Sequence, residues 1–319
     1  MEEKKIYDTI VIGGGAAGLT AAVYTCRKKM STLLVTVDIG GQTNLTMHIE
    51  NYPGYTDLSG PKLMQVFLDQ AVQFGTEVVY GKTEKVDKVG SNFHIKLSNG
   101  EEYEGRTLIL AYGKVPRELG IPGEKKFIGR GVSTCATCDM PLFKNKIVAI
   151  VGGGNSALEA ALLGSEFATK IYLMHRRDQF RGDPITVDKV KSKANVELIL
   201  NHAPVEIEGD KFVSGLVIED VNTKKQRELA VNGVFVEIGY IVETDFVKHL
   251  VELNDQNEIV VNDLCETRTP GLFSAGDLTN VPYKQTVISA GEGAKAGMTA
   301  YNYLQGLEGK PKAKVDWGV

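Results

Sequence analysis

The hydrophobic pattern of the chain repeats one arrangement twice. A run of apolar, β-branched residues leads into a glycine-rich turn, an Ala- and Leu-rich helical stretch follows, and a second apolar strand comes next. This order is typical of the βαβ repeat that binds a dinucleotide. The expected strand, helix and strand cover residues 9–12, 19–28 and 32–37 in the first repeat, and 146–151, 157–167 and 170–174 in the second.

Shorter patterns between and after the repeats predict further elements. Alternating apolar positions at Phe93–Leu97 and a run at Arg106–Ala111 flank the dipeptide Asn99-Gly100, which is typical of a hairpin turn. Short strands are also expected at 205–208, 215–219 and 233–238, and an Ala- and Gly-rich helix is expected at 286–304.

The spacing of these elements indicates an α/β fold with two Rossmann-like dinucleotide-binding domains. The first repeat has no strands of its own beyond about Ala111, so residues after about Glu243 must return to complete its sheet. The second repeat then belongs to an inserted domain. We expect one discontinuous domain at 1–113 and 244–319, and an inserted domain at 114–243.

Composition and charge narrow the function classes. Apolar residues make up 43% of the chain, charged residues 24%, and the formal net charge is −4, so no strong field favours nucleic acid or an anionic membrane. No apolar run approaches the roughly 20 residues that span a bilayer. The start of the chain is charged and the chain holds only four cysteines, which is unlike a signal peptide or a disulfide scaffold. We therefore expect a cytoplasmic protein that binds neither nucleic acid nor membrane.

The first glycine turn has the Gly-x-Gly-x-x-Gly pattern at Gly13, Gly15 and Gly18, with Ala16 and Ala17 between the last two. Its glycines permit a tight turn and a close approach of the backbone to a pyrophosphate, and the following helix offers free N–H groups. An acidic residue that would bind the ribose is expected about 20 residues further on. Asp38 lies near that position, just past the expected strand, and a solvated turn residue is the alternative interpretation.

The second glycine turn is followed by a basic cluster. Gly152, Gly154 and Ala157 form an accepted variant of the same pattern. Instead of the carboxylate that an NAD site places after the second strand, the chain has His175, Arg176, Arg177 and Arg181. Arginines offer planar, permanently charged forks to a 2′-phosphate, so this cluster favours NADP(H).

The alternative is an exposed basic loop whose arginines make weak surface pairs with Asp178 or Asp183. His175 alone is as well explained by a packed or exposed histidine, and we do not expect it to be catalytic.

One close cysteine pair, Cys135 and Cys138, lies just before the strand of the second repeat. A zinc site needs about four ligands, and neither a second such pair nor a histidine cluster is present. A pair of buried structural thiols is a further alternative. A redox dithiol is favoured, because two sulfurs at this spacing close a small ring that a thiolate can reopen. Asp139 is placed to move the proton, or else it is a helix or turn cap.

Taken together, the motifs resemble those of low-molecular-weight thioredoxin reductases over nearly the whole chain. The resemblance implies FAD at the first glycine turn, NADPH at the second, and a homodimer. It implies that Cys138 faces the flavin, Cys135 attacks the disulfide of thioredoxin or a thioredoxin-like protein, and Asp139 moves the proton. The motifs are 13–18, 40–42, 50–54, 135–139, 152–157, 175–181, 275–277, 284–285 and 289–291.

The resemblance also assigns the remaining cofactor-binding residues. Asp277 would meet the ribityl–phosphate region of FAD, and Gln285 and Thr286 would lie near the isoalloxazine. Other residues implied along the FAD are Gly41, Gln42, Asn51, Gly113, Gly276 and Lys284. Those implied at the NADPH site, besides the glycine turn and the arginines, are Asn155, Ser156 and His175.

The sequence departs from the usual family pattern after the acidic residue of the dithiol motif. Met140 stands where a small residue is common, a difference that bears on how the dithiol loop packs and so on the surface that docks the partner protein. Two other functions compete with thioredoxin reduction. One is a related flavin-dependent disulfide reductase or dithiol oxidase with another substrate, and the other is a flavin- and NADP-binding redox sensor.

Overall fold

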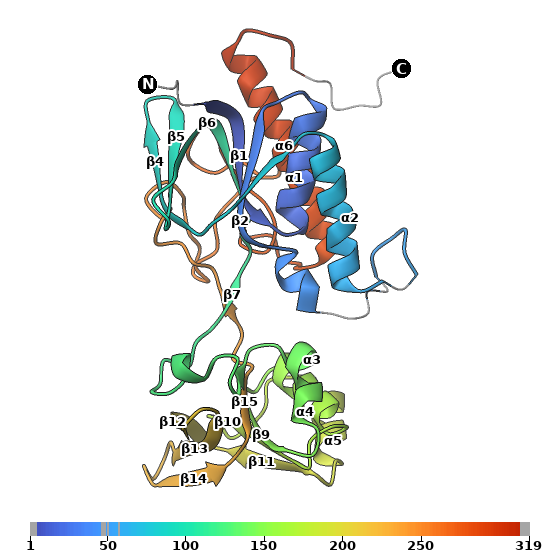
Figure 1. Ribbon diagram of the computed structural model, residues 1–319, viewed down its shortest axis with the longest axis vertical. Helices are drawn as coiled ribbons and strands as arrows, with labels where there is room; N and C mark the ends of the chain where they lie inside the picture. The colour runs from blue at the N-terminus through green and yellow to red at the C-terminus, as the bar shows by residue number, and fades with distance from the viewer. Residues whose placement is uncertain (1–4, 46–48, 50, 57, 313–319) are drawn as a thin grey trace. The chain divides into compact units, whose positions relative to one another are not determined.

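A computed structural model describes residues 5–45, 49, 51–56 and 58–312 (Figure 1). The chain divides into two compact units, and each is described by itself. Unit 1 comprises Met1–Lys114 and Val242–Val319, and unit 2 comprises Val115–Ile241. The chain passes from unit 1 to unit 2 after Lys114 and returns after Ile241. These two boundaries lie one and two residues from the domain limits expected from the sequence.

Unit 1 is built on one seven-stranded sheet in the order β3-β2-β1-β6-β5-β4, with β17 paired to β6. Neighbours among β3, β2, β1, β6 and β17 are parallel, while β4, β5 and β6 form an antiparallel meander. The strands are β1 (Ile6–Gly14), β2 (Thr32–Ile39), β3 (Glu77–Tyr80), β4 (Thr83–Val89), β5 (Asn92–Leu97), β6 (Glu102–Leu110) and β17 (Leu272–Ser274).

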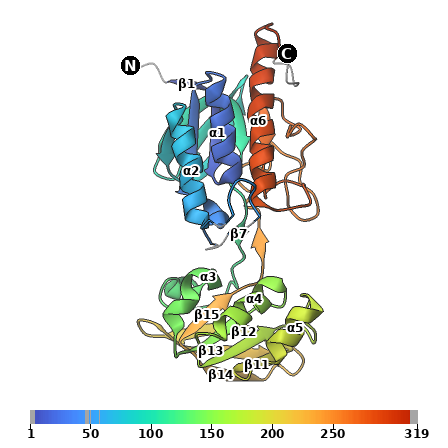
Figure 2. The same ribbon diagram turned by 90° about the vertical axis from the view of Figure 1, so that its right-hand side faces the viewer.

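Three helices lie side by side against this sheet: α1 (Ala16–Arg27), α2 (Gly60–Gln73) and α6 (Thr286–Leu307) (Figure 2). A short 3₁₀ turn, η1 (Gly41–Leu45), precedes α2. Small residues bring α1 and α6 together. A Cβ at Gly293 of α6 would overlap the backbone of Ala17, and one at Gly297 would lie 2.9 Å from the carbonyl oxygen of Ala21. The Ala- and Gly-rich composition of both helices therefore allows their backbones to touch.

Unit 2 has a parallel sheet in the order β11-β10-β9-β15-β8 and a separate antiparallel sheet, β12-β13-β14. Its first and last strands, β7 and β16, pair antiparallel where the chain enters and leaves the unit. The strands are β7 (Val115–Pro116), β8 (Val132–Ser133), β9 (Ile147–Val151), β10 (Lys170–His175), β11 (Val196–Leu200), β12 (His202–Gly209), β13 (Val213–Asp220), β14 (Gln226–Ala230), β15 (Gly233–Val236) and β16 (Tyr240–Ile241). The helices and turns are η2 (Lys125–Phe127), α3 (Ala136–Asp139), η3 (Met140–Phe143), α4 (Asn155–Gly164) and α5 (Pro184–Lys191).

The structure confirms the main topological expectations. The Asn99-Gly100 turn joins the antiparallel strands β5 and β6, and β17 returns to pair with β6 and extend the parallel part of the sheet. One local expectation is wrong: Asp38 lies inside β2, not beyond it. Along the described residues, no helix combines the length and apolar character needed to cross a membrane.

Candidate functional site

The first glycine turn connects β1 to α1 in unit 1. Gly13 has φ +116°, and a Cβ there would overlap the Ala111 carbonyl group, while one at Gly18 would overlap the carbonyl oxygen of Gly13. Gly15, by contrast, faces open space with nothing within 4 Å of a Cβ position, and it offers no side-chain cap to the start of α1 at Ala16. Free N–H groups beside open space fit a dinucleotide pyrophosphate.

The end of β2 closes this turn from the other side. The Gly14 N–H donates to Thr36 Oγ1 at 2.9 Å, and the Thr36 hydroxyl donates to the Asp38 carbonyl at 2.5 Å. The Asp38 carboxylate is exposed and accepts the Gly41 N–H at 3.2 Å. Thr36, the buried member of the pair, therefore braces the glycine turn, and Asp38 remains available to a ligand.

Several expected FAD residues meet one another in unit 1, although they are far apart in the chain. The Asn51 side chain donates to Gln285 Oε1 at 3.1 Å, and the Gln42 amide donates to the Lys114 carbonyl at 3.0 Å. Asp277 accepts a bond of 3.1 Å from the hydroxyl of Ser289 on α6. The fold thus brings together residues from η1, the 50–54 motif and the start of α6; Glu50 of that motif lies outside the described residues.

The remaining expected FAD residues also belong to unit 1. Gly41 and Gly113 both have positive φ and open space at their Cβ positions, Thr286 begins α6, and the Gly276 N–H donates to Glu292 at 2.7 Å.

The sequence motifs do not include Glu258, which lies between two lysines. Glu258 Oε1 lies 2.8 Å from Lys114 Nζ and 3.4 Å from Lys284 Nζ. Burial would raise the pKa of Glu258, but hydrogen bonds from Lys114 and Asn254 and the two lysine charges outweigh it and lower the pKa. Glu258 stands alone in a polar stretch of the sequence, with no motif around it, so no local pattern reveals it.

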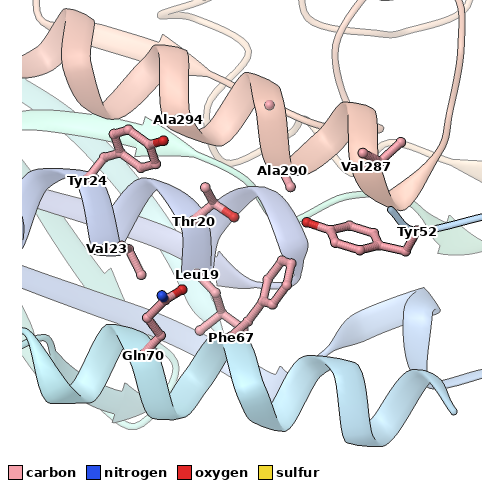
Figure 3. A pocket seen from close by; sticks show the side chains of 11 residues that line it. Leu19, Thr20, Val23, Tyr24, Tyr52, Phe67, Gln70, Val287, Ala290 and Ala294 are labelled. Carbon is pink, nitrogen blue, oxygen red and sulfur yellow. The ribbon is translucent and has the colours of Figure 1, made fainter. Parts of the chain in front are cut away.

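A cavity of about 270 Å³ lies between α1, α2 and α6 (Figure 3). Uncharged side chains line it, among them Leu19, Tyr52, Phe67 and Val287. None of the expected cofactor-binding residues lines this cavity. It is therefore separate from the glycine turn that begins α1.

The second glycine turn connects β9 to α4 in unit 2. A Cβ at Gly152 would overlap the Glu237 carbonyl oxygen, and one at Gly153 would overlap the His175 ring. Gly154 again faces open space and leaves the start of α4 without a side-chain cap. Ala157 fills the third position and is fully buried. This turn fits a second dinucleotide in the same way as the first.

The arginine loop folds back onto this turn. The backbone N–H of Arg181 donates to the Gly153 carbonyl at 2.7 Å, and the Asp183 N–H donates to Asn155 Oδ1 at 2.8 Å at the start of α4. Within the described part of the chain, Arg176, Arg177 and Arg181 form no ion pair. The surface pairs with Asp178 or Asp183 are therefore absent there, and the guanidinium groups are available to an anionic ligand.

His175 ends β10 behind the arginines. Its ring is buried, stacks on Phe180 with centroids 5.8 Å apart, and leaves Nε2 without a hydrogen-bond partner. Burial, followed by the charges of Arg181, Arg177 and Arg176, lowers the pKa of His175. The imidazole is therefore held neutral and acts as a packed support for the loop.

Cys135 and Cys138 form a disulfide bond on the short helix α3. Cys135 is the N-cap residue, and its sulfur accepts the Cys138 N–H at 3.2 Å. The Ser133 hydroxyl oxygen accepts the Cys135 N–H at 3.0 Å. Cys138 is exposed and Cys135 is half-buried. The two sulfurs are thus bonded to each other, and the redox role of the pair stays a prediction.

Asp139 and Met140 follow the disulfide directly. Asp139 occupies the N-cap position of η3, but its side chain makes no capping hydrogen bond. Met140 is fully buried, and its Cε would lie 3.0 Å from a Cβ at Gly164 of α4. The Met140 side chain thus packs into the core beneath α3, and its effect on the docking of a partner stays a prediction.

The two other cysteines, Cys26 and Cys265, are buried and free. Burial raises the pKa of the Cys265 thiol to about 11, and Cys26 lies 3.3 Å from the Thr76 hydroxyl. A thiol that stays protonated is a poor nucleophile. Among the described residues, no group of three or more metal-ligating side chains comes together.

The profile of the pyridine nucleotide-disulphide oxidoreductase family matches residues 7–295. The chain belongs to this family. It is 37% identical to a thioredoxin reductase of Bacillus subtilis over 310 residues, which is 97% of this chain and 98% of that protein. It is also 39% identical to the F component of the alkyl hydroperoxide reductase of Pseudomonas putida over 305 residues, 94% of this chain but only 59% of that protein.

The fold agrees with this family. The thioredoxin reductase of Lactococcus lactis superposes with a TM-score of 0.81 at 36% identity, covering 93% of this chain and 99% of that one. The T. acidophilum thioredoxin reductase has a TM-score of 0.78 at 31% identity, covering 95% and 100%. The chain thus combines membership of this family with the fold of low-molecular-weight thioredoxin reductases.

Proposed function

We propose that the protein is an NADPH-dependent thioredoxin-disulfide reductase that uses FAD. The observation that carries the proposal is the disulfide Cys135–Cys138 in the same unit as a glycine turn flanked by three arginines that form no ion pair with a described residue. The uncapped start of α1 in unit 1 supports FAD there. When bound, the two cofactors supply hydride and electron transfer.

The chain's own residues would carry the exchange with the partner protein. In the reduced protein, the Cys135 thiolate attacks one sulfur of the partner disulfide and forms a mixed disulfide. The Cys138 thiolate then attacks Cys135 Sγ, which releases the partner as a dithiol and re-forms the Cys135–Cys138 bond. Asp139, whose side chain makes no capping bond, is placed to protonate the departing thiolate.

The cofactor assignment extends to the residues around each turn. Arg176, Arg177 and Arg181 would bind the 2′-phosphate of NADPH, and Asn155 and Ser156 at the start of α4 would meet its pyrophosphate. In unit 1, Asp38 is free to accept a bond from the ribose of FAD. A cytoplasmic homodimer with thioredoxin or a thioredoxin-like protein as substrate completes the proposal.

A related disulfide reductase with another protein substrate is the second candidate. The F components of alkyl hydroperoxide reductases favour it, since they are 36–39% identical to this chain. The chain spans about 60% of their length, so a donor of electrons to a separate partner protein is the corresponding role here.

The test is an NADPH-dependent assay with oxidised thioredoxins and glutaredoxins, comparing the wild type with Cys135→Ser. The wild type should reduce at least one thioredoxin, and the variant should retain flavin bleaching by NADPH while losing at least ~10³-fold in thioredoxin reduction. Normal thioredoxin reduction by the variant would misplace the dithiol. Flavin bleaching by NADPH without turnover of any disulfide protein would favour the redox sensor.

A further inference from the structure

One acidic side chain that no motif includes lies beside the disulfide. Glu237 follows β15 at the carboxyl end of the parallel sheet of unit 2, and its N–H donates to the Val151 carbonyl at 2.8 Å. Its own carbonyl oxygen occupies the place of a side chain at Gly152. The neighbouring strand β8 leads to Cys135. Glu237 thus lies between the glycine turn and the disulfide turn.

The equivalent position in unit 1 holds an alanine. Ala111 follows β6, its N–H donates to the Ile12 carbonyl at 2.7 Å, and its carbonyl group occupies the place of a side chain at Gly13. Ala111 is buried. The fold therefore accepts a small apolar residue here, and a carboxyl group in unit 2 is not needed to form the turn.

Strand β15 pairs with β8 at Val234–Val132 and Phe235–Ser133, so Glu237 and Cys135 each lie two residues beyond a paired position. The Ala136 N–H, at the first residue of α3, favours the charged form of the Glu237 carboxylate. Glu237 therefore lies beside the backbone between the two cysteines.

The surroundings of Glu237 disfavour its charge. Burial raises the pKa of Glu237 to about 7, the Ala136 N–H opposes this rise, and the negative charge of Glu159 on α4 adds to it. Tyr240 on β16 also faces it, since burial and the Glu237 charge raise the pKa of that phenol. The cysteines of α3 complete the set of titratable groups, and no basic side chain of the described residues acts on Glu237.

We propose that Glu237 is a positioning residue that ties the protonation of the reduced dithiol to that of a partly buried carboxyl group, a role that rests on the redox function proposed for Cys135 and Cys138. Two electrons and one proton convert the disulfide into one thiolate and one thiol. A carboxylate beside the turn opposes the thiolate charge, whereas a neutral carboxyl group does not. Deprotonation of the thiol therefore disfavours deprotonation of the carboxyl group, and the reverse holds as well.

The proposal predicts how fast the dithiol reacts with iodoacetamide. The whole flavoprotein is reduced with excess dithiothreitol and desalted without oxygen, and alkylation of Cys135 and Cys138 is followed by mass spectrometry from about pH 5 to about pH 9. Glu237→Gln keeps an oxygen for the Ala136 amide but removes the charge. It should move the alkylation profile to lower pH and raise the rate at pH 7 at least about threefold.

Glu166→Gln is the matched control, because Glu166 is an exposed acid just beyond α4. Its profile should match that of the wild type. A second measurement uses the unaltered protein: infrared difference spectra between the oxidised and reduced forms should contain a carboxyl band that Glu237→Gln removes. Identical alkylation profiles for Glu237→Gln and the wild type, or an infrared band that survives the substitution, would overturn the coupling.

Neither measurement depends on NADPH or on a protein substrate. A shifted profile in a protein that fails to reduce any thioredoxin would count against the proposed function alone. An unshifted profile in an active reductase would count against the role of Glu237 alone.

Discussion

The two glycine turns of the molecule share one geometry and differ in what surrounds them. Each begins a helix without a side-chain cap, and each packs its first glycine against a backbone carbonyl. In unit 1 the strand after the turn carries Thr36 and Asp38 near its end. The Thr36 hydroxyl accepts the Gly14 N–H of the turn, and the Asp38 carboxylate accepts the Gly41 N–H. In unit 2 it ends on the buried His175, and three arginines that form no ion pair with a described residue follow it. In the proposed function, each turn binds a dinucleotide, and the end of the next strand selects which one.

The third position of the motif separates the two turns most sharply. A Cβ at Gly18 would overlap the carbonyl oxygen of Gly13, so helix and strand are closer than any side chain allows. Unit 2 has Ala157 at this position, and its Cβ is accommodated in the core. The glycine is therefore obligatory in the first turn and optional in the second.

Exchanging these residues has the largest expected effect. Gly18→Ala should displace α1 from β1, cost more than the about 1–3 kcal/mol typical of overpacked sites, and yield protein without bound flavin. Ala157→Gly should cost only about 1 kcal/mol and leave the flavin in place. Flavin absorbance per protein and thermal unfolding measure both, and equal flavin content in the two variants would contradict the close contact at Gly18.

Substitution of the arginines has the second largest expected effect, which is on KM for NADPH. Arg176→Ala with Arg181→Ala should raise KM for NADPH by about 100-fold, because two charge-assisted contacts to a phosphate are each worth about 1.5–3 kcal/mol. KM for NADH should change little. Arg130→Ala, a control elsewhere in unit 2, should change neither. Equal increases for NADPH and NADH would reject the 2′-phosphate assignment.

The residue that follows the strand beside each glycine turn differs as well. Ala111 follows β6 in unit 1, and Glu237 follows β15 in unit 2. Since the pKa of Glu237 is raised from 4.5 to about 7, the unfolded chain releases this proton first, and the wild type loses stability as pH rises between these values. Glu237→Gln lacks this loss. Its free energy of unfolding relative to the wild type should gain about 1–3 kcal/mol between pH 4.5 and pH 8.

Urea unfolding of the wild type and Glu237→Gln at several pH values tests this sign. A constant difference between the two proteins across the range would show that Glu237 has an ordinary pKa. The Glu166→Gln variant should show no trend.

The smallest effect is expected at Asp38. Its carboxylate is exposed and accepts the Gly41 N–H, so Asp38→Ala should weaken flavin retention by no more than about tenfold. Thr36→Val, which removes the hydroxyl that braces the turn, should weaken it more. Dialysis against a chaotropic salt followed by flavin absorbance ranks the two, and the reverse order would mean that the contact of Asp38 with the ribose contributes more to flavin retention than the Thr36 hydroxyl does.

The features that the sequence predicts are those encoded by local pattern. Glycine spacing, the Asn99-Gly100 hairpin and the return of the chain to β6 depend on backbone geometry that short motifs specify. Glu237 and Glu258 could not be predicted, because their importance comes from neighbours more than 100 residues away. The burial of Met140 could not be predicted either, because the space that it fills lies against Gly164 on another helix.

Counting electrons tests the central claim most directly. In an anaerobic titration, the wild type should take up about two NADPH per flavin, one for the flavin and one for the disulfide. The double variant with serine at Cys135 and Cys138 should take up about one. The same uptake in both proteins would show that the Cys135–Cys138 bond receives no electrons from the nucleotide sites.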